Sequence, residues 1–120
     1  MDRIEVKRQN SLEAVRELIA LLERCNAFNW AGKFHNVKDA LEAYDLDKAI
    51  TSYKRIPMPN MGGFLDLILC KENGHNVRDR DADNELLISI GSALSQAMHN
   101  LDVYINKKVD KDEVIIPNGN

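Results

Sequence analysis

The chain has 120 residues, of which 44% are hydrophobic and 29% are charged. That balance suits one globular domain with a modest core and is too apolar for a disordered chain. The formal net charge is −3 and the isoelectric point is about 5.6. This mild acidity argues against a nucleic-acid binder, because such proteins usually carry a clustered basic face.

The N-terminal sequence and the hydropathy pattern bear on where the protein works. Residues 1–10, MDRIEVKRQN, lack the apolar stretch of a signal peptide, and no segment approaches the ~20 apolar residues of a membrane span. We therefore expect a cytoplasmic protein without membrane contact. Residues 1–10 are expected to fray, with a short edge strand at Ile4 and Val6 as the alternative. Cys25 and Cys70 each end an apolar segment, which predicts buried free thiols.

The first predicted helix runs from about Leu12 to Cys25. Apolar residues repeat there at three- and four-residue steps, which is the period of an amphipathic helix. Ser11 is its predicted cap, and Glu13 lies in the first turn, where the helix dipole favours an anion.

Two shorter helices follow in the prediction. The second helix has Asn29 as its predicted cap, and the third has Asp45. The third helix is expected to end near Ile56, because Pro57 disfavours helical geometry in the residue before it. The apolar stripe of the second helix consists of Trp30, Phe34, Val37, Leu41 and Tyr44.

The segment after Pro57 is irregular and contains two adjacent glycines. The run Phe64–Cys70 fits either a strand or a short helix, because periodicity cannot decide between them over so few residues. In the strand alternative, Asn73 and Gly74 would form the turn of a short β-hairpin.

Asp66 stands inside this apolar run, and a carboxylate buried there without a partner would cost several kcal/mol. We favour a structural role in which Asp66 accepts hydrogen bonds from the backbone N–H groups of Met61, Gly62 and Gly63. The alternative is that Asp66 points outward and contacts a partner.

The last predicted helix begins near Asp83, its predicted cap, and ends at about Asn106. Gly91 and Ala93 are small enough to allow close contact between helices. Its predicted inner face consists of Leu87, Ile90, Leu94, Ala97, Met98, Leu101 and Ile105. We thus predict a mainly α fold: a compact bundle of four to five helices in residues 11–107, with one irregular glycine-containing insertion and a mobile tail at residues 108–120.

The sequence offers little for metal or cofactor chemistry. Asp79, Asp81 and Asp83 have the spacing of a calcium loop, but Asn84 stands at the glycine position and Ile90 at the position of the final glutamate. We therefore expect no metal and no cofactor.

Catalytic motifs are also lacking. His35 and Asp39 are too few for a metal site. Ser89, Ser92 and Ser95 recur on the last helix, and none lies in the Gly-x-Ser-x-Gly elbow of a hydrolase. We therefore expect a protein that is not an enzyme.

The stretch NMGGFLDLIL at residues 60–69 and the turn ENGH at residues 72–75 resemble a motif of a family of small bacterial proteins that has no established activity. The family core reads roughly Gly-Met-Gly-x-Phe-x-Asp-Leu, with an Asn-Gly-His turn downstream. The similarity covers about residues 11–105, although Asn60 stands where the family usually has Gly, and Gly63-Phe64-Leu65 replaces Ser-Phe-Asn. The motif residues are Met61, Gly62, Gly63, Phe64, Asp66, Asn73 and Gly74.

Small helical proteins of this kind resemble the immunity proteins of bacterial toxin systems, including contact-dependent growth inhibition and polymorphic toxins. The resemblance implies a monomer or homodimer that inhibits one cognate toxin domain, such as a basic nuclease, by binding it. It implies no direct binding of nucleic acid. The candidate contact residues are Asp45, Asp47, Asp66, Glu72, Asp79, Asp81, Asp83 and Glu85.

A solvated surface is the simpler explanation for each of these acids taken singly. Two other functions stay open. One is a helical regulatory or oligomerisation module without chemistry of its own. The other is a small enzyme with a pocket at the Gly62-Gly63 loop and Asp66 as its acid or base.

Overall fold

The computed structural model describes residues 2–57, 69–71 and 74–118, with side chains described up to residue 106. The described residues form four helices and no strand, which confirms the mainly α prediction. The motif residues Met61, Gly62, Gly63, Phe64, Asp66 and Asn73, together with Glu72, lie outside the described residues. The roles predicted for them, and the hairpin, therefore stay predictions.

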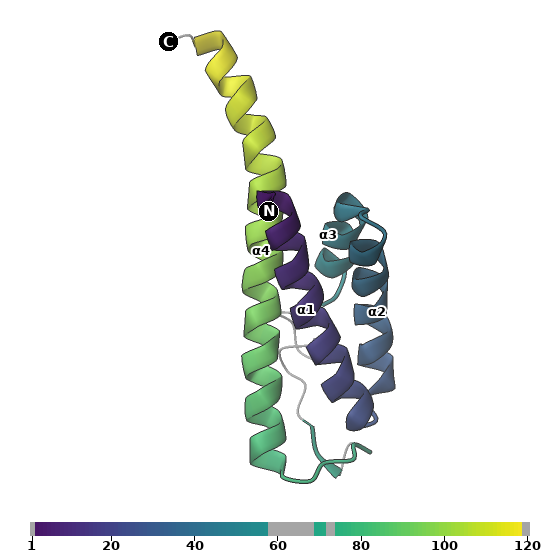
Figure 1. Cartoon of the computed structure of the whole chain (residues 1–120). Helices are drawn as coiled ribbons and strands as arrows, with labels where there is room; N and C mark the ends of the chain where they lie inside the picture. Colours follow the sequence, from purple (N-terminus) through teal and green to yellow (C-terminus); the bar gives the residue numbers. More distant parts are fainter. Residues whose placement is uncertain (1, 58–68, 72–73, 119–120) are drawn as a thin grey trace.

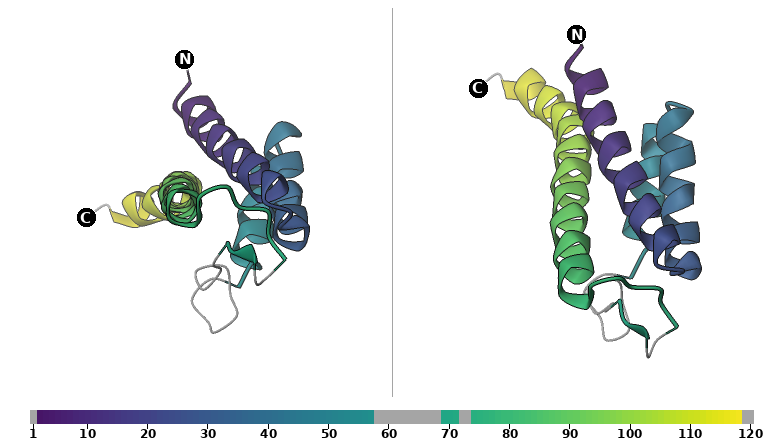
Figure 2. Two further views of the ribbon diagram at one scale, coloured as in Figure 1. Left: turned by 90° about the horizontal axis from the view of Figure 1, so that it is seen from below. Right: turned by 60° about the horizontal axis from the view of Figure 1, so that its bottom comes forward.

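The helices are α1 (Arg3–Arg24), α2 (Phe28–Glu42), α3 (Leu46–Lys54) and α4 (Arg80–Asn118). α1 lies between α2 and α4 and runs antiparallel to α4, while α3 packs mainly on α2 (Figures 1 and 2). With 39 residues, α4 is about 58 Å long at 1.5 Å per residue, whereas the 22 residues of α1 span about 33 Å. The C-terminal part of α4 therefore extends beyond the bundle (Figure 1).

α1 begins at Arg3 rather than at Leu12, so the predicted frayed end and edge strand are wrong. Asp2 is the N-cap, and its carboxylate accepts a hydrogen bond from the N–H of Ile4. Ile4 continues the apolar stripe by packing against the core. Ser11, the predicted cap, is instead fully buried in the helix interior, and its Oγ has no hydrogen-bond partner among the described residues.

The connections of α2 and α3 depend on two residues in the left-handed region. Asn26 (φ 63°) follows α1, and Tyr44 (φ 60°) follows α2, a conformation that costs energy for any residue other than glycine. Ala27 holds the cap position of α2 without a side-chain hydrogen bond, so the predicted Asn29 cap is wrong. The Asp45 cap of α3 is confirmed, because its carboxylate accepts from the N–H of Lys48 at 3.3 Å.

The apolar stripes predicted from the sequence form the core. Phe34, Val37 and Leu41 of α2 are fully buried, whereas Trp30 is only partly buried. Tyr44 leaves the stripe and is 64% exposed, because α2 ends before it. On α4, the buried side chains are Leu87, Ile90, Leu94, Met98 and Leu101.

Both ends of α4 differ from the prediction. The helix begins at Arg80, and the carboxylate of Asp79 caps it by accepting from the N–H of Ala82 at 3.1 Å. Asp83, the predicted cap, therefore lies in the first turn. The helix continues to Asn118 rather than ending near Asn106, and no glycine or proline interrupts the sequence between Gly91 and Pro117. The predicted tail is thus helical as far as residue 118.

The described part of the connection between α3 and α4 is held by hydrogen bonds. The amide side chain of Asn84 accepts from the N–H of Leu69 and donates to its carbonyl, both at 2.8 Å. Gly74 supplies the left-handed residue (φ 81°) of a turn in which the N–H of His75 donates to the carbonyl of Cys70.

The cysteines are as predicted. Cys25 and Cys70 are both buried free thiols, and burial raises the pKa of the Cys25 thiol. In the part of the chain that the structure describes, none of the helices has a stretch both long and apolar enough to cross a membrane.

Candidate partner-binding site

The structure divides those predicted contact residues that it describes between two ends of the bundle. Asp45 and Asp47 lie at the start of α3, whereas Asp79, Asp81 and Glu85 lie at the opposite end of the bundle, where α4 begins (Figure 1). Asp45 and Asp79 are also used as helix caps.

Asp83 is a structural residue rather than an exposed contact. It is only 6% exposed, and its carboxylate binds Arg24 at 2.7 Å and the N–H of Arg78 at 3.2 Å. The guanidinium of Arg24 beside it lowers the pKa of the Asp83 carboxyl. Arg24, Arg78 and Arg80 also offset much of the acidic charge at this end, so steering by these aspartates is weaker than their number suggests.

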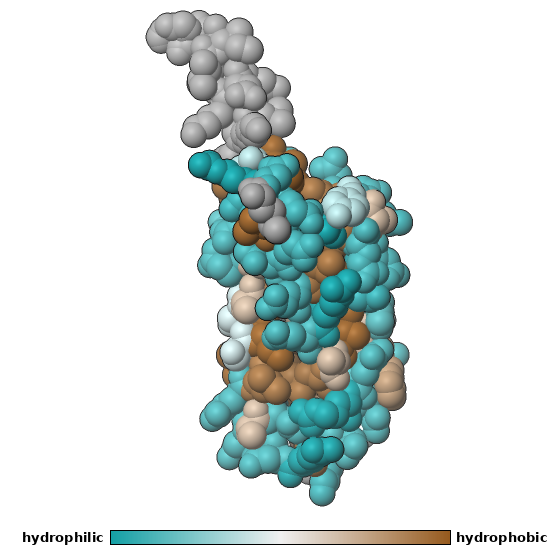
Figure 3. Space-filling view, in the orientation of Figure 1, coloured by the Kyte–Doolittle hydropathy of each residue, from teal (hydrophilic) through white to brown (hydrophobic). Residues whose placement is uncertain are grey.

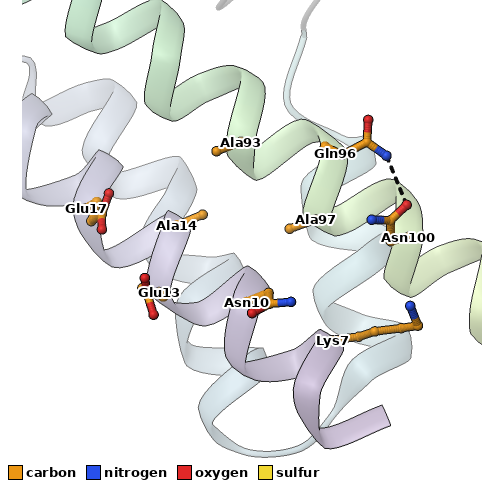
Figure 4. A pocket seen from close by; sticks show the side chains of 9 residues that line it. All are labelled: Lys7, Asn10, Glu13, Ala14, Glu17, Ala93, Gln96, Ala97 and Asn100. Atoms are coloured by element: carbon orange, nitrogen blue, oxygen red, sulfur yellow. Dashed lines mark hydrogen bonds between the residues drawn. The ribbon is translucent and has the colours of Figure 1, made fainter. Parts of the chain in front are cut away.

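A second surface was not predicted from the sequence: a groove of about 370 Å³ between α1 and α4 (Figure 4). Ala14 of α1 and Ala93 and Ala97 of α4 are the small residues of this groove, and their short side chains leave the space between the helices unfilled. In the space-filling view, hydrophobic side chains show between α4 and α1 and are bordered by hydrophilic ones (Figure 3).

Polar side chains surround the alanines. Gln96 and Asn100 line the groove from α4, and the amide of Gln96 donates to Asn100 Oδ1 at 2.9 Å (Figure 4). At the other end, the Nζ of Lys7 lies 5.5 Å from the centre of the Tyr104 ring, a cation–π contact between the two helices. The remaining lining residues are Asn10, Glu13 and Glu17 of α1.

Glu13 and Glu17 are the unusual members of this lining. They are exposed and lie one turn apart on α1. Neither carboxylate has an ion pair or hydrogen bond with any residue that the structure describes. The cause is visible in the sequence, because α4 carries no lysine or arginine between Arg80 and Lys107. The groove therefore has an acidic wall facing a neutral amide wall.

Two sequence signals point to this groove in retrospect. Ala93 and Ala97 are four residues apart, so they lie on one side of α4. The long stretch without lysine or arginine is the other signal. The small size of Ala93 by itself predicts close contact between helices. The structure instead leaves it exposed in the groove.

A smaller hollow of about 210 Å³ lies between α3 and α4. Lys54 of α3 binds Asp102 of α4 across it at 2.9 Å, and this lysine lowers the pKa of the Asp102 carboxyl. Tyr53, Ser95 and His99 also line the hollow. Its charges are thus already paired within the chain. Across residues 2–57, 69–71 and 74–106, no three histidine, cysteine or acidic side chains gather as a possible metal site.

A scan against protein-family models, a search of curated proteins and a search of solved structures found no match to this chain.

Proposed function

We propose that this chain is an immunity protein that binds and inhibits a cognate bacterial toxin domain in the cytoplasm. The observation that carries the proposal is the groove between α1 and α4, whose carboxylates Glu13 and Glu17 form no ion pair with any described residue. The resemblance of residues 60–75 to the motif of small bacterial proteins supports the same function.

The electrostatics of the groove suit a basic partner. A nuclease toxin carries lysine and arginine where it contacts phosphate, and carboxylates placed over such a surface both speed association and exclude acidic competitors. Protection at cellular concentrations requires nanomolar affinity or better, about −12 kcal/mol. Of the other candidate contacts, Asp47, Asp81 and Glu85 are exposed and without a described ion pair, so they can extend the interface.

The test is co-expression of this chain with the toxin domain encoded next to it, followed by growth measurement and isolation of the complex. An immunity protein restores growth and co-purifies with the toxin in a fixed ratio. Phe34→Ala, which removes a fully buried side chain, is a destabilised control that should protect poorly. Absence of both rescue and complex for the wild-type chain contradicts the proposal.

The length of α4 favours a second candidate, a helical oligomerisation module. Its last turns extend beyond α1 (Figure 1), and their sequence contains Val109, Val114, Ile115 and Ile116. A helix that extends beyond its own bundle can serve association with a second chain. Sedimentation of the full chain and of a chain ending at residue 106 decides this candidate. It requires that only the full chain associates.

A further inference from the structure

The groove also indicates what kind of structure it binds. We infer that it takes an α-helix of the partner protein, which places lysine or arginine against Glu13 and Glu17 and small side chains against Ala14, Ala93 and Ala97. The inference rests on the proposed function only for the identity of the partner. The chemistry of the occupant follows from the walls of the groove.

The backbone of the groove walls favours a helical occupant. Both walls are α-helices, so their N–H and C=O groups are already hydrogen-bonded within α1 and α4. An extended peptide would have to leave its own backbone groups against the alanines with no backbone partners. A helix brings its hydrogen bonds with it, so it can enter such a groove through side-chain contacts alone.

The dimensions of the groove also suit a helix. Helices pack with their axes about 8–10 Å apart, and small residues at the contact allow the closest approach. Ala14, Ala93 and Ala97 offer such a contact from two helices at once. The α1 wall runs from Lys7 to Glu17, a rise of about 15 Å, which matches about three turns of a docked helix.

The charges of the groove walls suit a cationic helix. Glu13 and Glu17 are separated by a rise of about 6 Å, the same as two lysines four residues apart on another helix. Lys7 is the one cation of the lining and is held over Tyr104 at the end of the groove. The opposite wall presents Gln96 and Asn100, which are uncharged and able to donate or accept. The occupant is therefore cationic on the side that faces α1.

The test uses the full ¹⁵N-labelled chain and a stapled, alanine-rich helical peptide with two lysines four residues apart. We expect amide shifts to concentrate at Ala14, Ala93 and Ala97. Two control peptides replace the lysines by glutamates or break the helix with proline. Equal binding of either control peptide, or lack of binding by the lysine peptide, overturns the inference.

Matched variants locate the binding site. Ala93→Phe fills the groove, whereas Ser92→Phe adds the same ring at the neighbouring exposed position of α4, which does not line it. Glu13→Gln/Glu17→Gln should weaken peptide binding by about tenfold, a loss typical of charge-pair contacts. The control Asp39→Asn removes an exposed acid of α2 that does not line the groove and should leave binding unchanged. Equal effects of the groove variants and their controls contradict the site.

The same variants, tested against the toxin domain, separate this inference from the proposed function. Growth rescue by the wild-type chain, with equal rescue and equal association rates for Ala93→Phe and for Glu13→Gln/Glu17→Gln, rejects the groove and keeps the immunity function. Lysine-peptide binding without any rescue keeps the groove and rejects the function. Concentration-dependent shifts at Ala93 and Ala97 without peptide, abolished by Ala93→Phe, would identify the occupant as a second copy and overturn the inference of a foreign helix.

Discussion

The two flanks of α1 treat their acidic residues in opposite ways. On the flank toward α2, Glu5 binds Arg8 at 2.8 Å and Glu23 binds His35 at 2.9 Å. On the flank toward α4, Glu13 and Glu17 have no partner among the described residues. Glu5 pairs within α1 and Glu23 pairs with His35 of α2, whereas the stretch of α4 beside Glu13 and Glu17 has no lysine or arginine.

This contrast separates stability from binding. Paired charges toward α2 stabilise the fold, whereas two like charges one turn apart, such as Glu13 and Glu17, cost a helix about 0.2–0.5 kcal/mol. Glu13 and Glu17 therefore cost stability and add nothing to the core, which is typical of residues that serve function.

Phe34→Ala should have the largest effect, because it tests the core between α1 and α2. Phe34 is fully buried, so the substitution removes transfer energy and leaves a cavity, which should cost about 3–5 kcal/mol in the free energy of unfolding. Phe28→Ala is the control on the same helix, because Phe28 is 60% exposed and should change stability by less than about 0.5 kcal/mol. Urea unfolding measures both, and similar losses would refute the assignment of the core.

Arg8→Ala tests the polar contacts at the N-terminal end of the same flank. The buried guanidinium donates to Glu5, to the carbonyl of Leu41 at 3.0 Å and to the hydroxyl of Tyr44 at 2.9 Å. Removing it leaves these acceptors unsatisfied, so we expect a loss of about 2–4 kcal/mol. Arg8→Lys should recover only part of that loss, because an ammonium group cannot reproduce the fork of contacts. Full recovery would mean that charge alone matters here.

Asp83→Asn tests the ion pair between Arg24 of α1 and Asp83 of α4. The variant keeps the size of the side chain but loses the charge that binds Arg24, at a cost of about 1–2 kcal/mol, because Arg24 is partly exposed. Asp81→Asn is the control two residues earlier on α4, since Asp81 is exposed and has no described ion pair. Thermal unfolding should lower Tm only for Asp83→Asn, and equal Tm values would contradict a structural role.

Acid should weaken the ion pair between Glu5 and Arg8. Hydrogen bonds from Arg8, and then from Gln9, lower the pKa of Glu5 from 4.5 to about 2. Because the folded pKa lies below the unfolded one, the stabilisation is complete above about pH 4.5 and is lost as the pH falls toward 2. The stability difference between wild type and Glu5→Gln should therefore shrink over that range. A difference that is constant with pH would show that Glu5 does not titrate as the geometry implies.

Glu13→Gln/Glu17→Gln should have the smallest effect on the fold, and its sign should be opposite. Removing two like charges is expected to raise the free energy of unfolding by about 0.2–0.5 kcal/mol, while partner association becomes slower and less sensitive to salt. Chemical unfolding and association kinetics at two salt concentrations measure both quantities. A clear loss of stability would place these acids with those on the other flank.

Most of the fold could be predicted from local patterns. The stripes of α2 and α4, the Asp45 cap and the helix stop before Pro57 each depend on residues a few positions apart. Ser11 is a favourable N-cap by residue type, so the sequence predicts a later start for α1 than the structure shows. The burial of Ser11 in the helix interior follows from contacts that no local pattern contains.

The sequence by itself determined the helices, the core residues and the long stretch of α4 without lysine or arginine, since these follow from spacing and composition. Only the tertiary structure decided which acids are exposed and which of them lie close together. Asp83 is buried because it meets Arg24, 59 residues away, and Asp47 and Asp81 lie at opposite ends because α3 and α4 begin there. The groove likewise exists only because α1 sets two unpaired glutamates and Ala14 beside the alanines of α4. Such juxtapositions depend on how the helices pack, which side-chain periodicity alone does not specify.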